Sequence, residues 1–235
     1  RYGDDFSADH VRTMGLYLVQ ELVVGRALEA ELEAHRYDAD EALAVADELL
    51  EILGRLHRLS PPVIHRDVKP GNVMRRDDGR LVLVDFGAVK SVVDDTPSMS
   101  TVAGTFGYMA PEQLYGGAVP ASDLYGVGAV LVRLLTRQDP AALTEAGQRP
   151  AWRHLANVPD AVAALVDALL SPNPEDRPAS ADAARAAIAR ARAGGSGGAA
   201  DGGAGDGRGL DGVADRTPSG DEDGDGDGDG DGDGD

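Results

Sequence analysis

The side chains best suited to chemistry lie in a short polar run between two apolar segments. This run, His65-Arg66-Asp67-Val68-Lys69-Pro70-Gly71-Asn72, combines a carboxylate, an ammonium group and an amide. Asp85-Phe86-Gly87 begins 18 residues after Asp67, and Pro111 of Ala110-Pro111-Glu112 follows Asp85 by 26 residues. These residue types suit a reaction that depends on positioning and on neutralising charge, such as the transfer of a phosphoryl group.

The elements that must position these motifs follow from hydrophobic periodicity and from turn residues. A mostly apolar run over 16–23, ended by Gly25, predicts a buried strand, and Asp77-Asp78-Gly79 predicts the turn of a hairpin. The hairpin strands are expected at 73–75 and 81–85, and helices at 38–59, 123–135, 161–170 and 180–192, the last with Ser180 as N-cap. The polar motifs therefore fall on the connecting loops, and the long loop before Pro111 is of a kind that usually carries function.

The motifs, in this order and with this spacing, resemble the large lobe of a eukaryotic-type (Hanks-type) Ser/Thr protein kinase of prokaryotic origin. The resemblance covers residues 2–192, and Lys69, two places after Asp67, matches the Ser/Thr branch. It implies an α+β, protein-kinase-like fold with a mainly helical C-terminal lobe, a hinge strand and a small β-hairpin. Residues 1–193 would form the kinase domain, from the end of the N-lobe through the C-lobe, and 194–235 a disordered Gly/Asp-rich acidic tail.

The resemblance also implies which residues would transfer the γ-phosphate of ATP to a Ser or Thr hydroxyl. Asp67 would accept the proton of that hydroxyl. Lys69 would neutralise negative charge that builds on the γ-phosphate. Asn72 and Asp85 would supply the hard oxygen ligands of Mg²⁺, or of Mn²⁺ in its place.

Nucleotide binding would fall mainly to the predicted strand before Gly25. The resemblance places Gln20 at the gatekeeper position, and it places the backbone of Glu21 and Val23 at the adenine edge. Met74, just after the metal-binding Asn72, would lie beneath the adenine ring, and the same side chain would equally suit an ordinary core position.

The segment from Asp85 to Glu112 resembles the activation loop of such kinases. Arg66 would grip a phosphorylated residue of this loop, and Thr101 matches the position of that residue. Thr105 would instead contact the catalytic loop near Asp67. The resemblance implies protein substrates with Ser or Thr, and it is compatible with autophosphorylation and with a homodimer.

Further matches are architectural. Glu112 and Arg177 would form a buried ion pair, and Asp123 would accept hydrogen bonds from the backbone around His65 and Arg66. The residues expected to have structural roles are His65, Arg66, Phe86, Gly87, Glu112, Asp123 and Arg177. His57 is interpreted as a satisfied core histidine and not as a metal ligand.

One part of the family pattern has no counterpart in the sequence. The glycine-rich phosphate loop, the strand lysine and its glutamate partner should precede the hinge, but only Gly3 and Gly15 occur before residue 25 and no lysine precedes Lys69. The chain begins with Arg1, which fits a fragment of a longer protein or a truncated gene product. We therefore expect residues 1–235 alone to be inactive or weakly active.

Two alternatives from other functional classes stay open. A pseudokinase or docking module would bind a protein partner without phosphoryl transfer, but it would have no need of Asp67, Lys69, Asn72 and Asp85 together. A small-molecule kinase of the aminoglycoside or choline type would keep a similar catalytic loop and metal aspartate. The segment Ala110-Pro111-Glu112 is not expected in that class.

Composition narrows the class of protein further. The chain of 235 residues has a net charge of −19, which argues against nucleic acid and anionic membranes as partners. It has no cysteine, and thus neither disulfides nor thiolate metal sites. It also shows no run of about 18 apolar residues and no signal peptide, so we expect a cytoplasmic protein without a membrane segment. The excess of Asp over Lys fits a halophile, and high genomic GC content equally explains the preference for Arg.

Overall fold

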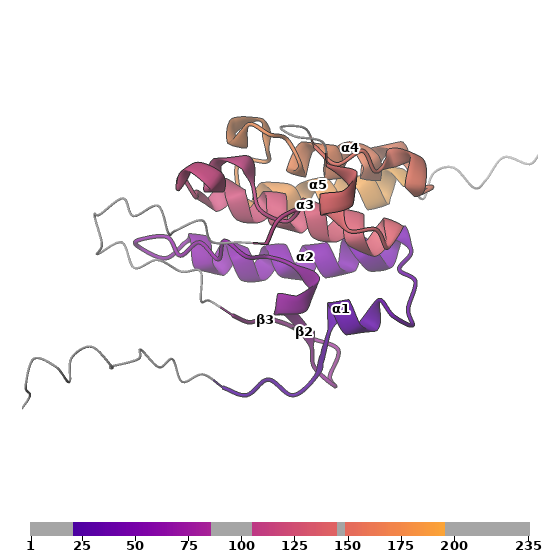
Figure 1. The fold of residues 1–235 in the computed structure, drawn as a ribbon, viewed down its shortest axis with the longest axis horizontal. Helices are drawn as coiled ribbons and strands as arrows, with labels where there is room; N and C mark the ends of the chain where they lie inside the picture. Colours follow the sequence, from indigo (N-terminus) through magenta and orange to yellow (C-terminus); the bar gives the residue numbers. More distant parts are fainter. Residues whose placement is uncertain (1–20, 86–104, 145–148, 196–235) are drawn as a thin grey trace, which may run out of the picture. The chain divides into compact units, whose positions relative to one another are not determined.

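The computed structural model describes residues 21–85, 105–144 and 149–195, which all lie within one compact unit (Figure 1). The strands and α-helices are β1 (Arg26–Ala27), α1 (Leu28–Glu31), α2 (Ala39–His57), β2 (Val73–Arg75), β3 (Leu81–Leu83), α3 (Pro120–Thr136), α4 (Asp160–Leu169) and α5 (Ala181–Gly195). Short 3-10 helices occupy Pro70–Asn72, Pro111–Tyr115, Pro140–Leu143, Arg153–Leu155 and Pro174–Asp176. A set of helices beside one small sheet confirms the predicted α+β class.

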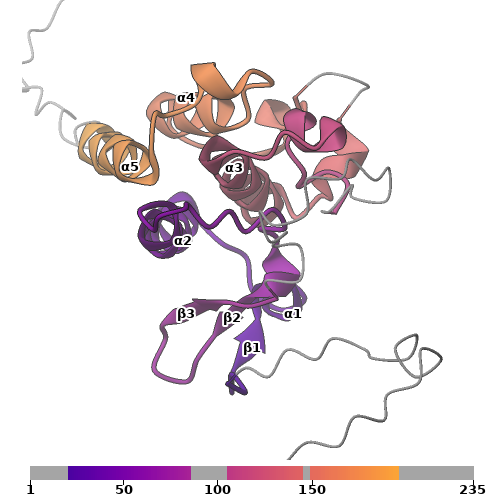
Figure 2. The same ribbon diagram turned by 90° about the vertical axis from the view of Figure 1, so that its left-hand side faces the viewer.

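The sheet is antiparallel, with strand order β1-β2-β3 (Figure 2). Val73 pairs with Leu83 and Arg75 with Leu81, and the turn between these strands contains Gly79 at φ 86°. This left-handed conformation favours glycine, because a Cβ would be strained there. The predicted hairpin is therefore confirmed, although its second strand ends at Leu83.

The strand predicted before Gly25 is wrong for the part that the structure describes. Residues 21–24 have no strand structure, and residues 16–20 lie outside the described residues. A strand needs a neighbouring backbone with which to form hydrogen bonds. That neighbour becomes available only at Arg26 and Ala27, which pair with Arg75 and Met74 of β2.

The four predicted helices are confirmed with small changes at their ends. Asp38 caps α2, because its side chain accepts a hydrogen bond from the Glu41 amide at 2.8 Å and the Glu41 side chain accepts one from the Asp38 amide at 3.0 Å. Ser180 caps α5 by accepting a hydrogen bond from the Ala183 amide at 3.1 Å. The start of α3 is three residues earlier than predicted, at Pro120, where proline suits the first turn of a helix.

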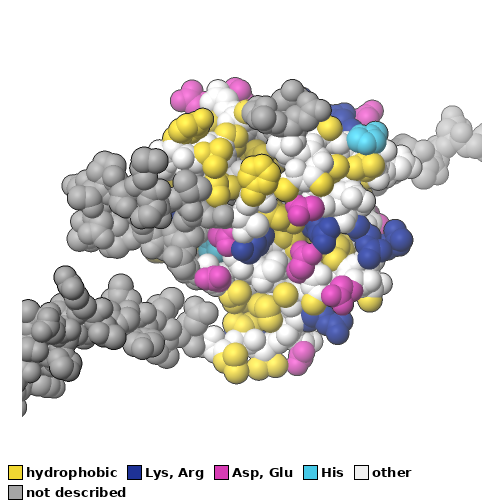
Figure 3. All heavy atoms as spheres, viewed as in Figure 1, with side chains coloured by type: hydrophobic (Ala, Val, Ile, Leu, Met, Phe, Trp, Pro, Cys, Tyr) yellow, Lys and Arg dark blue, Asp and Glu magenta, His cyan; other side chains and the backbone are white. Residues whose placement is uncertain are grey.

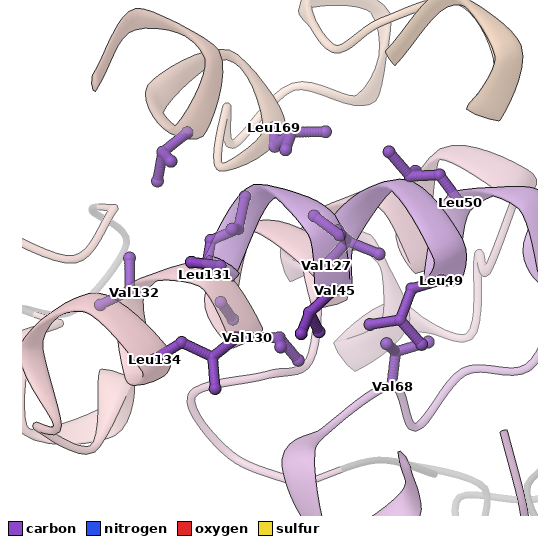
Figure 4. Packing of buried hydrophobic residues seen from close by; sticks show 14 of the residues in the cluster. Val45, Leu49, Leu50, Val68, Val127, Val130, Leu131, Val132, Leu134 and Leu169 are labelled. Carbon is purple, nitrogen blue, oxygen red and sulfur yellow. The ribbon is translucent and has the colours of Figure 1, made fainter. Parts of the chain in front are cut away.

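The core lies between α2, α3 and α4 (Figure 4). Leu49 of α2, Val127 of α3 and Leu169 of α4 are fully buried, and Val68, next to Asp67 in the loop before β2, joins the same cluster. Most of α3 is buried, as its apolar sequence predicts. The helix can therefore serve as a fixed support for the loop that contains Asp67.

Two glycines allow α3 to approach its neighbours closely. A Cβ at Gly126 would lie 2.8 Å from Cβ of Val68, and one at Gly128 would lie 2.9 Å from Cβ of Leu169. Gly126 thus allows the loop that contains Val68 to pack against α3, and Gly128 allows α4 to pack against α3.

Charged side chains of both signs lie next to one another on the face shown in Figure 3. Between α2 and α5, Arg185 pairs with Asp47 at 2.9 Å, and Arg58, at the C-terminal end of α2, pairs with Asp182 at 3.0 Å. Such half-exposed pairs each contribute only about 0–1 kcal/mol to stability. Of the helices described, none combines the length and apolar character needed to cross a bilayer.

Candidate active site

Asp123 binds the backbone of the loop that contains Asp67. This residue is buried near the start of α3, and its carboxylate accepts hydrogen bonds from the backbone amides of His65 at 2.9 Å and Arg66 at 2.8 Å. The ring of His57 lies 2.8 Å from the same carboxylate. One buried carboxylate on α3 therefore helps to set the orientation of the loop.

A second support comes from Gln113, which the sequence analysis missed. Its Nε2 donates to the carbonyl of Arg66 at 2.8 Å, and its Oε1 accepts from the Ala110 amide at 3.0 Å. Arg66 has φ 70°, an uncommon backbone conformation for a residue other than glycine. The only feature of the sequence that draws attention to Gln113 is its position directly after Glu112. That position does not predict a contact with Arg66.

The carboxylate of Asp67 lies at the centre of a small polar network. Its oxygens accept hydrogen bonds from Thr105 Oγ1 at 2.9 Å and from Asn72 Nδ2 at 2.9 Å. Lys69 Nζ lies 2.8 Å from the same carboxylate and donates to Thr105 Oγ1 at 2.6 Å. The structure therefore brings together Asp67, Lys69 and Asn72 with a threonine that lies 38 residues away in the sequence.

This network keeps Asp67 ionised. Burial by itself would raise the pKa of the Asp67 carboxyl, but hydrogen bonds from Lys69, Thr105 and Asn72 outweigh burial and lower that pKa below its ordinary value. Burial also lowers the pKa of His65, despite the nearby Asp123 charge. The site thus presents a charged, partly buried acceptor beside a neutral imidazole at neutral pH.

The hairpin register brings the two expected metal ligands to one end of the sheet. The Val84 amide donates to the carbonyl of Asn72 at 2.9 Å, so Asp85 follows directly after the residue paired with Asn72. The Asn72 amide nitrogen is occupied by Asp67, at both its backbone and side-chain oxygens, which leaves Oδ1 of Asn72 as the atom able to bind a metal ion. Asp85 has φ 64°, an uncommon backbone conformation for a residue other than glycine.

These two residues fit a divalent ion of the magnesium type. Both offer hard oxygen atoms, and Mg²⁺ commonly takes only one or two protein ligands while phosphates and waters complete its shell. Within the described part of the chain, no group of three or more His, Cys, Asp or Glu residues forms a metal site made of protein alone. A shared site with a phosphate compound therefore suits the donor set.

The residues expected at the nucleotide lie around β2, except Gln20, which is outside the described residues. Met74 occupies the middle of β2 and is half-buried opposite Val82 and Ala27. Val23 is half-buried, whereas the exposed side chain of Glu21 pairs with Arg76 at 2.8 Å. The backbone of the segment before β1 therefore lies near the strand that contains Met74.

The expected activation-loop residues Phe86, Gly87 and Thr101 also lie outside the described residues. Arg66, expected to bind a phosphorylated Thr101, is half-buried, and its Nε is buried without a hydrogen-bond partner among the residues described. The end of this segment is held by Glu112. Its carboxylate pairs with Arg177 at 2.7 Å and accepts a hydrogen bond from Ser122 Oγ at 2.6 Å.

In the ion pair of Glu112 with Arg177, the arginine is shielded from water. The side chain of Arg177 is fully buried, and its guanidinium carbon lies 5.1 Å from the centre of the Tyr125 ring. Burial would raise the pKa of Glu112, but the hydrogen bonds from Arg177 and Ser122 lower it. This pair joins the segment after Thr105 to the chain between α4 and α5.

The chain is similar to a known protein family and to several named proteins. Residues 8–187 match the protein kinase domain family. Serine/threonine-protein kinase F of Synechocystis is 38% identical over 179 residues, covering 73% of this chain and 36% of that protein. Serine/threonine-protein kinase PknA of Nostoc is 38% identical over 172 residues, covering 68% and 30%. PknL of Mycobacterium tuberculosis is 37% identical over 183 residues, covering 72% and 45%. The chain thus spans about a third to a half of the length of these relatives.

Proposed function

Because this chain belongs to the protein kinase domain family, we propose that it transfers the γ-phosphate of ATP to Ser or Thr hydroxyls of protein substrates. The observation that supports this most strongly is the network in which Asp67 contacts Lys69, Thr105 and Asn72. Relatives that are 34–40% identical to this chain and are named Ser/Thr kinases support the same reaction. A pseudokinase would have no use for this complete set of side chains.

In the proposed reaction, Asp67 orients the acceptor hydroxyl and takes up its proton. A general base must be ionised before transfer, and the lowered pKa of Asp67 meets this condition at neutral pH. The hydrogen bonds from Asn72 and Thr105 fix the carboxylate, and Oδ1, which among the described residues accepts only from Thr105, can still accept the substrate hydroxyl. Positioning of this kind supplies much of the catalysis in phosphoryl transfer.

Lys69 supplies the positive charge of the site. Its ammonium group contacts both Asp67 and Thr105, which holds it beside the group that accepts the proton. An ammonium group here would stabilise negative charge on the transferred phosphoryl group. A bound Mg²⁺, or Mn²⁺, would neutralise phosphate charge, with Asn72 Oδ1 and Asp85 as its protein ligands.

Regulation would act through the activation loop. A phosphate on Thr101 would add about two negative charges near Arg66, whose buried Nε is free of a partner among the described residues. Autophosphorylation is the simplest source of that phosphate. We place the reaction in the cytoplasm, where ATP is available to a kinase.

Substitution of Asp67 by Asn tests the proposed chemistry. In a form of the protein that has a complete small lobe, Asp67→Asn should lower kcat on a Ser/Thr peptide by about 10²–10⁴-fold, because an amide cannot accept the hydroxyl proton. The affinity for ATP and Mg²⁺ should change little. Radiolabelled phosphate transfer and calorimetric nucleotide binding measure the two effects.

Asp78→Asn, in the exposed hairpin turn, is the matched control and should leave both quantities unchanged. Wild-type turnover by Asp67→Asn would refute the role given to Asp67. Nucleotide binding without any transfer by the wild-type protein would instead support the pseudokinase alternative.

A further inference from the structure

The segment 21–27, here called the hinge segment, is held against β2 at both of its ends. Arg26 and Ala27 pair with Arg75 and Met74, and Glu21 pairs with Arg76 at 2.8 Å. Between them, the side chains of Leu22 and Val24 are 85% and 68% exposed, whereas Val23 is half-buried. The stretch before β1 runs as an extended trace in Figure 1, with Val23 as its half-buried side chain.

The backbone of Gly25 lies close to the backbone of β2. A Cβ at Gly25 would lie 2.2 Å from the carbonyl oxygen of Arg75 and 2.9 Å from its carbonyl carbon. Both are backbone atoms, so no side chain could turn aside to make room. This glycine is needed for space and not for an unusual backbone angle.

Arg75 cannot readily move away from such a clash. Its backbone lies in the central strand, paired with Arg26 on one side and Leu81 on the other. Its side chain donates to the Glu31 carboxylate at 3.1 and 3.2 Å. A larger residue at position 25 would therefore displace the hinge segment and leave β2 in place.

We infer that Gly25 and the Glu21–Arg76 pair are positioning residues for the base of the nucleotide. They set the distance between the backbone of residues 21–23 and Met74 on β2, the two parts of the chain proposed to contact adenine. This inference rests on the proposed function. It adds that recognition of the base, and not of the phosphates, depends on how closely the hinge segment lies against β2.

Binding of two ligands to a form of the protein that has a complete small lobe tests the inference. Calorimetry would compare ATP with inorganic tripolyphosphate, each with Mg²⁺, because tripolyphosphate has no base. Gly25→Ala should weaken ATP binding by roughly tenfold or more, since displacement of about 1 Å can already cost a hundredfold where geometry matters. Tripolyphosphate binding should stay the same.

The matched control is Gly117→Ala, where the new Cβ would meet only the Glu112 carbonyl oxygen at 3.4 Å, an ordinary contact. If Gly25→Ala does not fold, Glu21→Gln and Arg76→Gln provide the test. Each should weaken ATP binding by a few-fold without affecting tripolyphosphate, and the double variant should be no weaker than either single one.

The outcomes separate the inference from the function on which it rests. Equal ATP affinity for the wild-type chain and the variants would overturn the inference alone. Equal losses for ATP and tripolyphosphate would also overturn it, because the base would then have no special part. A wild-type protein with a complete small lobe that binds no ATP would overturn the proposed function and the inference with it.

Discussion

Thr105 connects the segment before Pro111 to the loop that contains Asp67 through a single hydroxyl group. That hydroxyl accepts a hydrogen bond from Lys69 at 2.6 Å and donates one to Asp67 at 2.9 Å. A hydroxyl can do both at once, whereas a methyl group can do neither. The geometry of the charged pair therefore depends on a residue outside the loop that contains it.

Thr105→Val should lower kcat by roughly 10–100-fold, because a hydrogen bond to a charged group contributes about 1.5–3 kcal/mol. Thr105→Ser keeps the hydroxyl and should retain most of the activity. Steady-state kinetics with a Ser/Thr peptide would measure both variants. If Val and Ser variants were equally active, the hydroxyl would have no part in positioning Lys69 and Asp67.

At the scale of elements, α3 supports both the catalytic loop and the C-terminal helices. Its carboxylate at Asp123 binds the loop backbone, and its two glycines allow the neighbouring segments to pack closely. The C-terminal side of this packing can be changed without touching the site, because Gly128 faces Leu169 and Leu170.

Gly128→Ala should destabilise the fold by about 1–3 kcal/mol through overpacking. The new Cβ would lie 2.9 Å from Cβ of Leu169 and 3.0 Å from Cγ of Leu170, both fully buried. Gly54→Ala on α2 is the control, since its closest neighbour is the end of the flexible Arg58 side chain at 3.3 Å. That variant should be neutral or slightly stabilised by the helix propensity of Ala. Urea unfolding would contradict the packing argument if Gly128→Ala were as stable as the wild type.

Acid should destabilise the folded protein, because three of its buried or half-buried groups bind protons less readily when folded. The pKa values of His65, Asp67 and Glu112 are all lowered by folding. The unfolded chain then takes up more protons, so stability falls as pH falls. The His65 contribution is lost as pH falls below its ordinary pKa of 6.5, and those of Glu112 and Asp67 as pH falls below 4.5 and 3.8.

Glu112→Gln should be less stable than the wild type at pH 7 by about 3–5 kcal/mol, because it leaves the buried Arg177 charge unpaired. Its stability should also change less with pH below 5, since the titrating carboxylate is gone. Urea unfolding from pH 4 to pH 8 would measure both effects. Parallel pH profiles for the two proteins would show that Glu112 does not contribute to acid sensitivity.

Local signals in the sequence were enough to predict several helix ends, the hairpin turn and the residues around Asp67. Ser180 caps α5 and Gly79 specifies the hairpin turn, because caps and turns depend on residues a few positions apart. The order of the motifs likewise pointed to the residues that surround Asp67. These predictions needed no knowledge of how distant segments pack.

Tertiary structure alone decided where β1 forms, which residue holds the Arg66 carbonyl and why Gly25 is a glycine. Strand pairing depends on a neighbouring edge, and that edge lies on β2, about 50 residues further along the chain. Gln113 contacts Arg66, which lies 47 residues away in the sequence. Gly25 has no room for a side chain because the carbonyl of Arg75 lies too close. Such contacts arise when packing brings separate segments within hydrogen-bond or van der Waals distance, and no local pattern encodes that distance.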